Sequence, residues 1–293
     1  MNRLQQPATA AICALLGELL DAAAQCADRL ESSADISALH DFRVALRRLR
    51  ANERAYRDQI HVKQNMPLRR LARATNAARD REVQLDWLRM QRKEAKPGVF
   101  GDLDGLIEDM AIQQAAERRQ DSAHWREDFA VLAKKMRRRL KKISRKKLSS
   151  GSFAWIAGAK LHSLGDKLRQ RFASIEAQGD DAAVHAARII GKHLRYLAEP
   201  IASEVPGTPL LIRRLKALQD LLGEIHDCQV RLDNFAGQRN QNRAPQYAAL
   251  RRHTSARRAQ LLAKLQNHWL GKHSDVLFKP LQRVIAHLNN SLH

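Results

Sequence analysis

Residues that interrupt helices are scarce in this sequence, because glycine and proline together supply only 21 of its 293 residues. Ala, Leu, Arg, Gln and Glu, which are strong helix formers, dominate instead. No run of residues alternates apolar and polar side chains as a half-buried strand would. The sequence therefore predicts an all-α protein. Helix breaks are expected near residues 32–37, 65–67, 96–101, 149–151, 178–181, 200–209 and 239–245.

Cysteines, aromatic residues and long apolar runs are also few. The three cysteines, Cys13, Cys26 and Cys228, have no CxxC or zinc-type spacing, which predicts a reduced, cytoplasmic setting. Aromatic residues make up 5% of the chain, which argues against proteins that stack single-stranded bases on aromatic platforms. No window approaches the roughly eighteen apolar residues of a membrane span, so none is expected. Gly17 and Glu18 interrupt the N-terminal apolar stretch, which favours an amphipathic helix over a signal peptide.

Signatures of catalysis and of cofactor binding are absent from the sequence. It contains no GxxxxGKS/T, GxGxxG, HExxH or GxSxG motif. His40 and His185 lack a second histidine or carboxylate at i+3 or i+4 on the same helical face, and Glu199 lies far from His185 along its helix. We therefore predict no enzymatic activity, no metal ion and no cofactor.

Acidic residues are too few to balance the basic ones. The chain has 52 Lys and Arg against 31 Asp and Glu, a net charge of +21 with histidines neutral. This charge excludes a cationic ligand and favours a polyanion, an acidic protein or an anionic membrane. Arginine outnumbers lysine by 36 to 16, and its planar fork suits phosphate oxygens better than a lysine point charge does.

A basic motif occurs twice in the chain. Residues 39–50 read LHDFRVALRRLR and residues 184–196 read VHAARIIGKHLRY, so that His40 aligns with His185 at an offset of 145 positions. The alignment also pairs Arg43 with Arg188, Arg47 with Lys192, Arg48 with His193, Leu49 with Leu194 and Arg50 with Arg195.

A second pair of motifs follows in the same order. Residues 71–85 and 218–232 match at an offset of 147, which aligns Asp80 with Asp227. Two matched motifs in one order predict two homologous helical halves. The predicted domains are residues 1–150 and 151–293.

The repeated basic residues fall on one side of each predicted helix. On a helical wheel, those of the first half lie within about 100° of arc. They are His40, Arg43, Arg47, Arg50, Arg54 and Arg57. Phe42, Leu46, Leu49 and Tyr56 form an apolar stripe that should face the core. The second half repeats the basic stripe as His185, Arg188, Lys192 and Arg195, with Ile190, Leu194 and Leu197 as its apolar stripe.

The basic stripes are predicted to bind an anion. Like charges at i,i+4 destabilise a helix, so a stripe with almost no acid in it argues against a plain solvated surface. Asp80 and Asp227 are either general bases or, in the favoured interpretation, carboxylates that position an arginine of their own half. Arg79 would then also reach the anion, and His226 stands at its position in the second half.

A separate basic run covers residues 134–147, with ten basic residues in fourteen. Met136, Leu140 and Ile143 carry an apolar seam through it. Three interpretations stay open: the run lines the same anion site, binds nucleic acid, or is an exposed connector. Arg137 and Arg138 are its candidate binding residues.

In these motifs the sequence resembles the CHAD domain family. The resemblance rests on the helices at 40–50 and 185–195 and on those at 71–83 and 218–230. It implies two pseudo-symmetric antiparallel helical bundles with a basic groove between them, binding of inorganic polyphosphate, and localisation to polyphosphate granules in the cytoplasm. The contacts it implies are His40, Arg43, Arg47, Arg50, His185, Arg188, Lys192 and Arg195. The sequence departs from the pattern at Asn76, which aligns with Gly223, and at His226.

The leading hypothesis is therefore a non-catalytic polyphosphate-binding protein. The alternative is a helical protein that binds nucleic acid non-specifically through its basic surface, although no base-reading module is present. A polyphosphate-hydrolysing enzyme would need a metal site or nucleophile that the sequence does not show.

Overall fold

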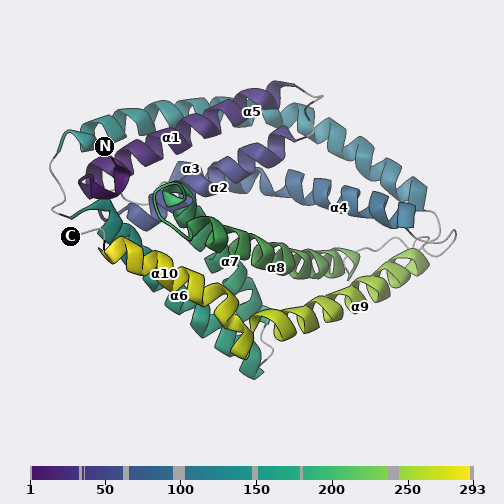
Figure 1. The fold of residues 1–293 in the computed structure, drawn as a ribbon. Helices are drawn as coiled ribbons and strands as arrows, with labels where there is room; N and C mark the ends of the chain where they lie inside the picture. Colours follow the sequence, from purple (N-terminus) through teal and green to yellow (C-terminus); the bar gives the residue numbers. More distant parts are fainter. Residues whose placement is uncertain are drawn as a thin grey trace. The chain divides into compact units, whose positions relative to one another are not determined.

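The structure is a computed structural model that describes residues 2–32, 35, 37–61, 66–94, 103–146, 151–178, 181–236 and 244–290. These residues form ten α-helices and short 3-10 segments, and they contain no strand (Figure 1). One isolated antiparallel bridge joins Pro7 to Ser152. The all-α prediction is confirmed.

The helices begin and end close to the predicted breaks. The α-helices are α1 (Ala8–Asp28), α2 (Ala38–Tyr56), α3 (Met66–Ala74), α4 (Asn76–Glu94), α5 (Leu103–Ser144), α6 (Phe153–Gln178), α7 (Asp181–Ala198), α8 (Thr208–Ala236), α9 (Ala244–Trp269) and α10 (Asp275–Asn290). The 3-10 segments are η1 (Arg3–Gln5), η2 (Arg29–Glu31), η3 (Glu199–Ile201) and η5 (Gly271–Ser274).

The chain divides into two compact units. Unit 1 consists of Met1–Ile12, Lys147–Ala236 and Arg252–His293, and unit 2 consists of Cys13–Lys146 and Gly237–Arg251. Unit 1 is thus assembled from separate segments of the chain. That the chain is a duplication of two halves, 1–150 and 151–293, stays a prediction.

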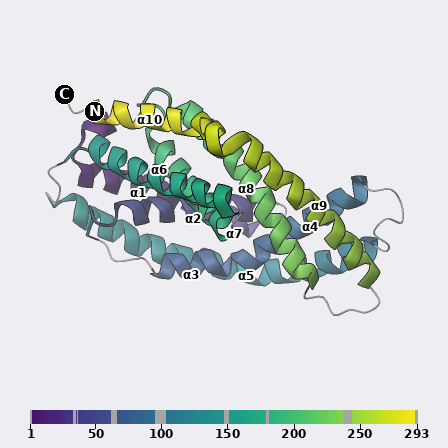
Figure 2. The ribbon, with the colours of Figure 1, turned by 90° about the horizontal axis from the view of Figure 1, so that it is seen from below.

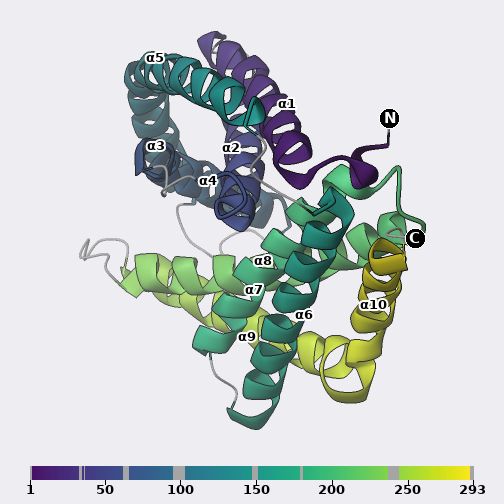
Figure 3. The same ribbon diagram turned by 90° about the vertical axis from the view of Figure 1, so that its left-hand side faces the viewer.

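The core of unit 2 forms around α2. Its predicted apolar stripe is buried, since Phe42 and Leu49 are fully inaccessible and Leu46 is 1% exposed. The Phe42 ring packs edge-on against Phe129 of α5, with 5.4 Å between ring centroids. α1 lies beside α5 in this unit (Figure 3), and α4 packs along α5 as well. Burying one face of α2 leaves its basic face on the outside of this packing.

Unit 1 is built from α6, α7, α8 and α10, together with most of α9. α6 and α10 run side by side (Figure 2). α7 packs against both α6 and α8. Phe172 of α6 meets Phe278 of α10 with ring centroids 5.7 Å apart. The predicted apolar stripe of α7 is buried at Leu194 and Leu197, whereas Ile190 is half-buried.

α1 passes the length and hydropathy test for a membrane span over residues Ala8–Glu31. This is weak evidence, because the core helix of a soluble protein passes the same test. In this chain, 44% of the most apolar window is buried inside the structure. Ile12, Leu16 and Leu20 are fully inaccessible, which matches the amphipathic helix that the sequence predicts.

One local feature differs from the sequence pattern. The motif at residues 71–83 is not one helix, because α3 ends at Ala74 and α4 begins at Asn76. The hydroxyl of Thr75 between them donates to the carbonyl of Ala72 at 3.1 Å, a local bond that competes with continued helix geometry. The corresponding motif in the second half lies within the continuous helix α8.

Candidate anion-binding site

The basic stripe of α2 meets the start of α4 within unit 2. The guanidinium of Arg43 donates through Nη1 to Thr75 Oγ1 at 2.8 Å and to Asn76 Oδ1 at 3.0 Å. Thr75 is fully buried, so it is a fixed anchor. Asn76, the position at which the sequence departs from the family pattern, thus holds an arginine of the predicted site.

A second contact fixes Arg79. Its Nη1 donates to Glu82 Oε2 at 2.9 Å, one helical turn away on α4. The Glu82 side chain is 7% exposed, whereas that of Arg79 is 25% exposed. A buried carboxylate therefore holds the guanidinium in place while part of it stays open to solvent.

The remaining charges of this region are mostly positive. Burial and then the charges of Arg79 and Arg47 lower the pKa of His40. Burial, Arg47 and Arg79 also lower the pKa of Arg43, to about 10, although Asp80 and Glu82 oppose this effect. These mutual effects place His40, Arg43, Arg47 and Arg79 near one another.

Arg50 extends the cluster toward α3. Burial lowers its pKa first, followed by the charges of Arg69 and Arg73 on α3, while Glu53 has the opposite effect. Arg69 and Arg73 were not predicted as binding residues. The two arginines have i,i+4 spacing on an amphipathic helix, next to the buried Leu68. This pattern could have predicted that they share one face. We call His40, Arg43, Arg47, Arg50, Arg69, Arg73 and Arg79 the arginine cluster of unit 2.

The arginine cluster holds like charges together at a cost. The Nε atoms of Arg43 and Arg47 are buried and have no hydrogen-bond partner among the described residues. A buried N–H donor that makes no hydrogen bond lowers the stability of the folded protein. An anion that accepts from them would remove both this cost and the repulsion between neighbouring cations.

Other predicted residues lie apart from the cluster. Burial and the charge of Asp41 raise the pKa of Cys26, and the charges of Arg29 and Arg48 oppose this rise. Arg48 therefore lies on the side of α2 that faces α1. Arg137 of α5 donates through Nη2 to Asp21 of α1 at 2.7 Å. Arg54 and Arg138 are exposed. The structure therefore brings together most of the α2 stripe with Arg79 but directs Arg48 and Arg137 toward α1.

In unit 1, α7 and α8 bring two histidines together. The rings of His185 and His226 lie 5.3 Å apart between centroids, at an interplanar angle of 49°. Burial lowers the pKa of His226 to about 4, helped by the charges of Arg188, His185 and Lys192, while Asp227 raises it. Three predicted residues of the α7 stripe thus converge on His226.

The pairing of His185 with His226 has a counterpart in unit 2. There, His40 lies beside Arg79, which aligns with His226 in the sequence. In both units, the residue at this aligned position lies near the first histidine of the basic stripe. In unit 1, this position is His226, whose imidazole is neutral at pH 7. In unit 2, it is Arg79, whose guanidinium is permanently charged.

Arg195, the last residue of the predicted α7 stripe, is engaged within its own helix. Its Nη1 lies 3.4 Å from Glu199 Oε1, and its guanidinium lies 5.0 Å from the Tyr196 ring centroid. Both contacts reduce the charge that Arg195 offers to a ligand. Arg231, which the sequence analysis did not select, has a pKa lowered by burial and raised by the charge of Asp227.

The two motif aspartates lie near arginines of their own unit, as the favoured interpretation expected. Asp80 is near Arg43, and Asp227 is near Arg231. Among the described residues, no group of three or more His, Cys, Asp or Glu side chains could hold a metal ion.

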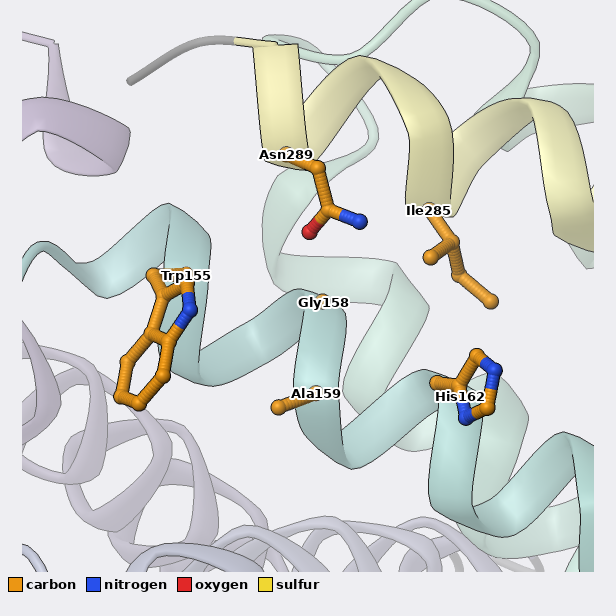
Figure 4. A pocket seen from close by; sticks show the side chains of 6 residues that line it. All are labelled: Trp155, Gly158, Ala159, His162, Ile285 and Asn289. Atoms are coloured by element: carbon orange, nitrogen blue, oxygen red, sulfur yellow. The ribbon is translucent and has the colours of Figure 1, made fainter.

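A hollow on the surface of unit 1 does not belong to this site (Figure 4). Its volume is about 320 Å³, and it lies between α6 and α10. The lining residues are Trp155, Gly158, Ala159, His162, Ile285 and Asn289. It is lined by no arginine or lysine, so its chemistry does not suit a polyanion.

Known proteins share this architecture. A family model of the CHAD domain matches residues 14–236. The crystal structure of the CHAD domain from the plant Ricinus communis is similar to this chain, with a TM-score of 0.68 and 22% sequence identity. The likeness covers 96% of this chain and 93% of that chain, and at this identity it shows a common fold. No curated protein matches the chain.

Proposed function

This chain belongs to the CHAD domain family, and we propose that it binds inorganic polyphosphate through the arginine cluster of unit 2 and through His185, Arg188, Lys192 and Arg195 of α7. The family is linked to polyphosphate binding in general. The proposal for this chain rests on its own residues. The observation that carries it is the arginine cluster of unit 2.

The cluster has the properties of a prepared phosphate site. Thr75, Asn76 and Glu82 hold Arg43 and Arg79 in place, so little side-chain freedom is lost when a ligand binds. Arginine forks donate to phosphate oxygens in pairs, and such charge-assisted bonds are about twice as strong as neutral ones. Burial and the charges of Arg47 and Arg79 lower the pKa of His40 and of Arg43, so an anion is the ligand that relieves this repulsion.

Polyphosphate fits this site better than nucleic acid does. It offers a continuous series of phosphates and no bases. The cluster includes no Phe, Tyr or Trp side chain that would serve as a platform for a base. We further propose that the protein acts in the cytoplasm at polyphosphate granules and that binding involves no chemical conversion of the ligand.

Titration at matched phosphate concentration and salt tests the ligand. Polyphosphate should bind more tightly than either single-stranded or double-stranded nucleic acid. Equal or tighter binding of nucleic acid would exclude polyphosphate as the specific ligand. Incubation with polyphosphate and a divalent metal should release no phosphate, and release would show that the protein is an enzyme.

Charge reversal tests the site. The double variant Arg47→Glu with Arg50→Glu should weaken polyphosphate binding at least about tenfold, because it removes two cations and places two anions in the cluster. Isothermal titration calorimetry measures the loss, and circular dichroism checks that the helices remain.

The control is Arg213→Glu with Arg214→Glu, which makes the same change in net charge at two exposed residues of α8. This control should bind nearly as well as the wild type. If both double variants lose affinity equally, binding follows net charge and the cluster is not the site.

A further inference from the structure

The C-terminal part of α5 carries a dense positive surface that the arginine cluster does not include. Nine lysines and arginines at the end of α5 and directly after it, between residues 134 and 146, are exposed. Arg137 pairs with Asp21 of α1, and we call the other eight the α5 basic face. They are Lys134, Lys135, Arg138, Arg139, Lys141, Lys142, Arg145 and Lys146. The α5 basic face belongs to unit 2, as the arginine cluster does.

The opposite side of α5 is buried, and this burial keeps the α5 basic face directed toward solvent. Met136, Leu140 and Ile143 are each 8% exposed and form the buried seam that the sequence predicted. About two turns earlier, Phe129 packs on Phe42 of α2. Side chains two residues before or after a seam position point to the far side of the helix. Lys134, Arg138, Lys141 and Arg145, which we call the outer line, stand there.

The charges of the α5 basic face are not balanced within the part of the chain that the structure describes. No acidic residue follows Asp128 in α5. Within residues 134–146, Arg137 forms an ion pair, and its partner is Asp21 of α1. The helix dipole favours cations only within the last turn, so it does not account for Lys134 or Arg138.

The two basic surfaces of unit 2 differ in chemistry. The arginine cluster consists of arginines and one histidine, several of them half-buried and anchored by hydrogen bonds. The α5 basic face contains five lysines and three arginines, all exposed. Exposed lysines on flexible stems attract phosphate as point charges without fixing its orientation. The α5 basic face is therefore suited to a mobile polyanion segment.

We propose that the α5 basic face is a second contact surface for polyphosphate, engaged by the part of a long chain that extends beyond the arginine cluster. This inference rests on the proposed function. A homopolymer presents the same phosphates to both surfaces, so one chain can occupy both. No aromatic residue lies between Lys134 and Lys146, so the face has no platform for bases.

The consequence is an affinity that rises with chain length. The outer line spans about 16 Å, at 1.5 Å per helical residue. Once one segment is held by the arginine cluster, the rest of the chain is at high effective concentration near the α5 basic face. A short polyphosphate bound at the cluster gains nothing from this surface.

Neutralising the outer line tests the inference. The quadruple variant K134Q/R138Q/K141Q/R145Q changes exposed side chains to glutamine, a good helix former. The matched control R213Q/R214Q/K216Q/K264Q removes two lysines and two arginines from exposed positions of unit 1. The probes are tripolyphosphate, long-chain polyphosphate and duplex DNA at one phosphate concentration and low salt.

We expect the quadruple variant to bind long-chain polyphosphate at least about tenfold more weakly while binding tripolyphosphate as the wild type does. The slope of log K against log salt for the long chain should fall by up to about four, one for each lost phosphate contact. The matched control should retain both affinities.

Three results would overturn the inference. Unchanged long-chain affinity in the quadruple variant means that the face makes no contact. An equal loss for tripolyphosphate means that the outer line belongs to the first site. A loss confined to duplex DNA means that the face serves nucleic acid. If the wild type binds neither polyphosphate, the proposed function itself has failed, which separates the two claims.

Discussion

The surroundings of His226 oppose the charge of its imidazole. It is half-buried and lies near Arg188, His185 and Lys192, which together with burial bring its pKa to about 4 from an ordinary 6.5. Asp227 opposes this effect without reversing it. At pH 7 the folded protein therefore holds this imidazole neutral.

This shift predicts a loss of stability on acidification. Because the pKa of His226 is lower in the folded than in the unfolded protein, the unfolded chain binds more protons below pH 6.5. The free energy of unfolding should therefore fall as the pH drops from about 6.5 toward 4. The contribution of this one residue between pH 7 and pH 5 is about 2 kcal/mol.

Urea denaturation of the wild type and of His226→Gln at pH 7 and pH 5 measures this contribution. The variant should lose less stability than the wild type over this interval, because glutamine does not titrate. Parallel losses in the two proteins would show that His226 is not the residue responsible.

At the residue scale, the sequence predicted which side chains are basic and which face they share, but not what each one contacts. Arg48 and Arg137 lie toward α1, a placement that the sequence did not predict, and anion binding by these two residues stays a prediction. A helical wheel gives the direction of a side chain and says nothing of the neighbouring helix that it meets. The anchors Thr75 and Glu82 were missed for the same reason.

At the scale of elements, apolar periodicity and breakers predicted most of the fold. The apolar stripe of α2 is buried as expected. The described helices begin and end at or near the expected breaks. The break at Thr75 was not predicted, because no glycine or proline marks it. It depends on a side-chain bond to the backbone of Ala72 and on Arg43 arriving from another helix.

The packing of α6 on α10 gives a prediction at this scale. A Cβ atom at Gly165 would lie 2.7 Å from Cδ2 of Leu281, which is 2% exposed and has little room to move. Gly165→Ala should therefore lower the free energy of unfolding by about 1 kcal/mol, since overpacking costs more than the helix propensity of alanine returns. Thermal denaturation followed by circular dichroism measures the change.

Gly17 of α1 provides the matched control, because a Cβ atom there would meet nothing within 4 Å. Gly17→Ala should leave stability unchanged or raise it by up to about 1 kcal/mol. A destabilisation equal to that of Gly165→Ala would mean that close helix packing is not the cause.

For the whole molecule, the net charge of +21 makes polyanion binding and stability interdependent. A polyanion that binds only the folded protein stabilises it, by about 2.7 kcal/mol at a free concentration one hundred times Kd. Polyphosphate should therefore raise the melting temperature, and added salt should reduce the increase as counterions compete.

Differential scanning calorimetry with and without long-chain polyphosphate checks this prediction. The charge-reversed variant at Arg47 and Arg50 should show a smaller increase at the same ligand concentration. An increase that persists unchanged at high salt would contradict an electrostatic origin.

The bridge between Pro7 and Ser152 constrains the order in which the protein folds during synthesis. The amide of Ala8 donates to the carbonyl of Gly151 at 2.9 Å, and the amide of Phe153 donates to the carbonyl of Gln6 at 3.0 Å. These bonds cannot form until the ribosome has released residue 153. By then all of Cys13–Lys146 has emerged, so the larger segment of unit 2 can begin to fold while the N-terminal segment of unit 1 still waits for its partner.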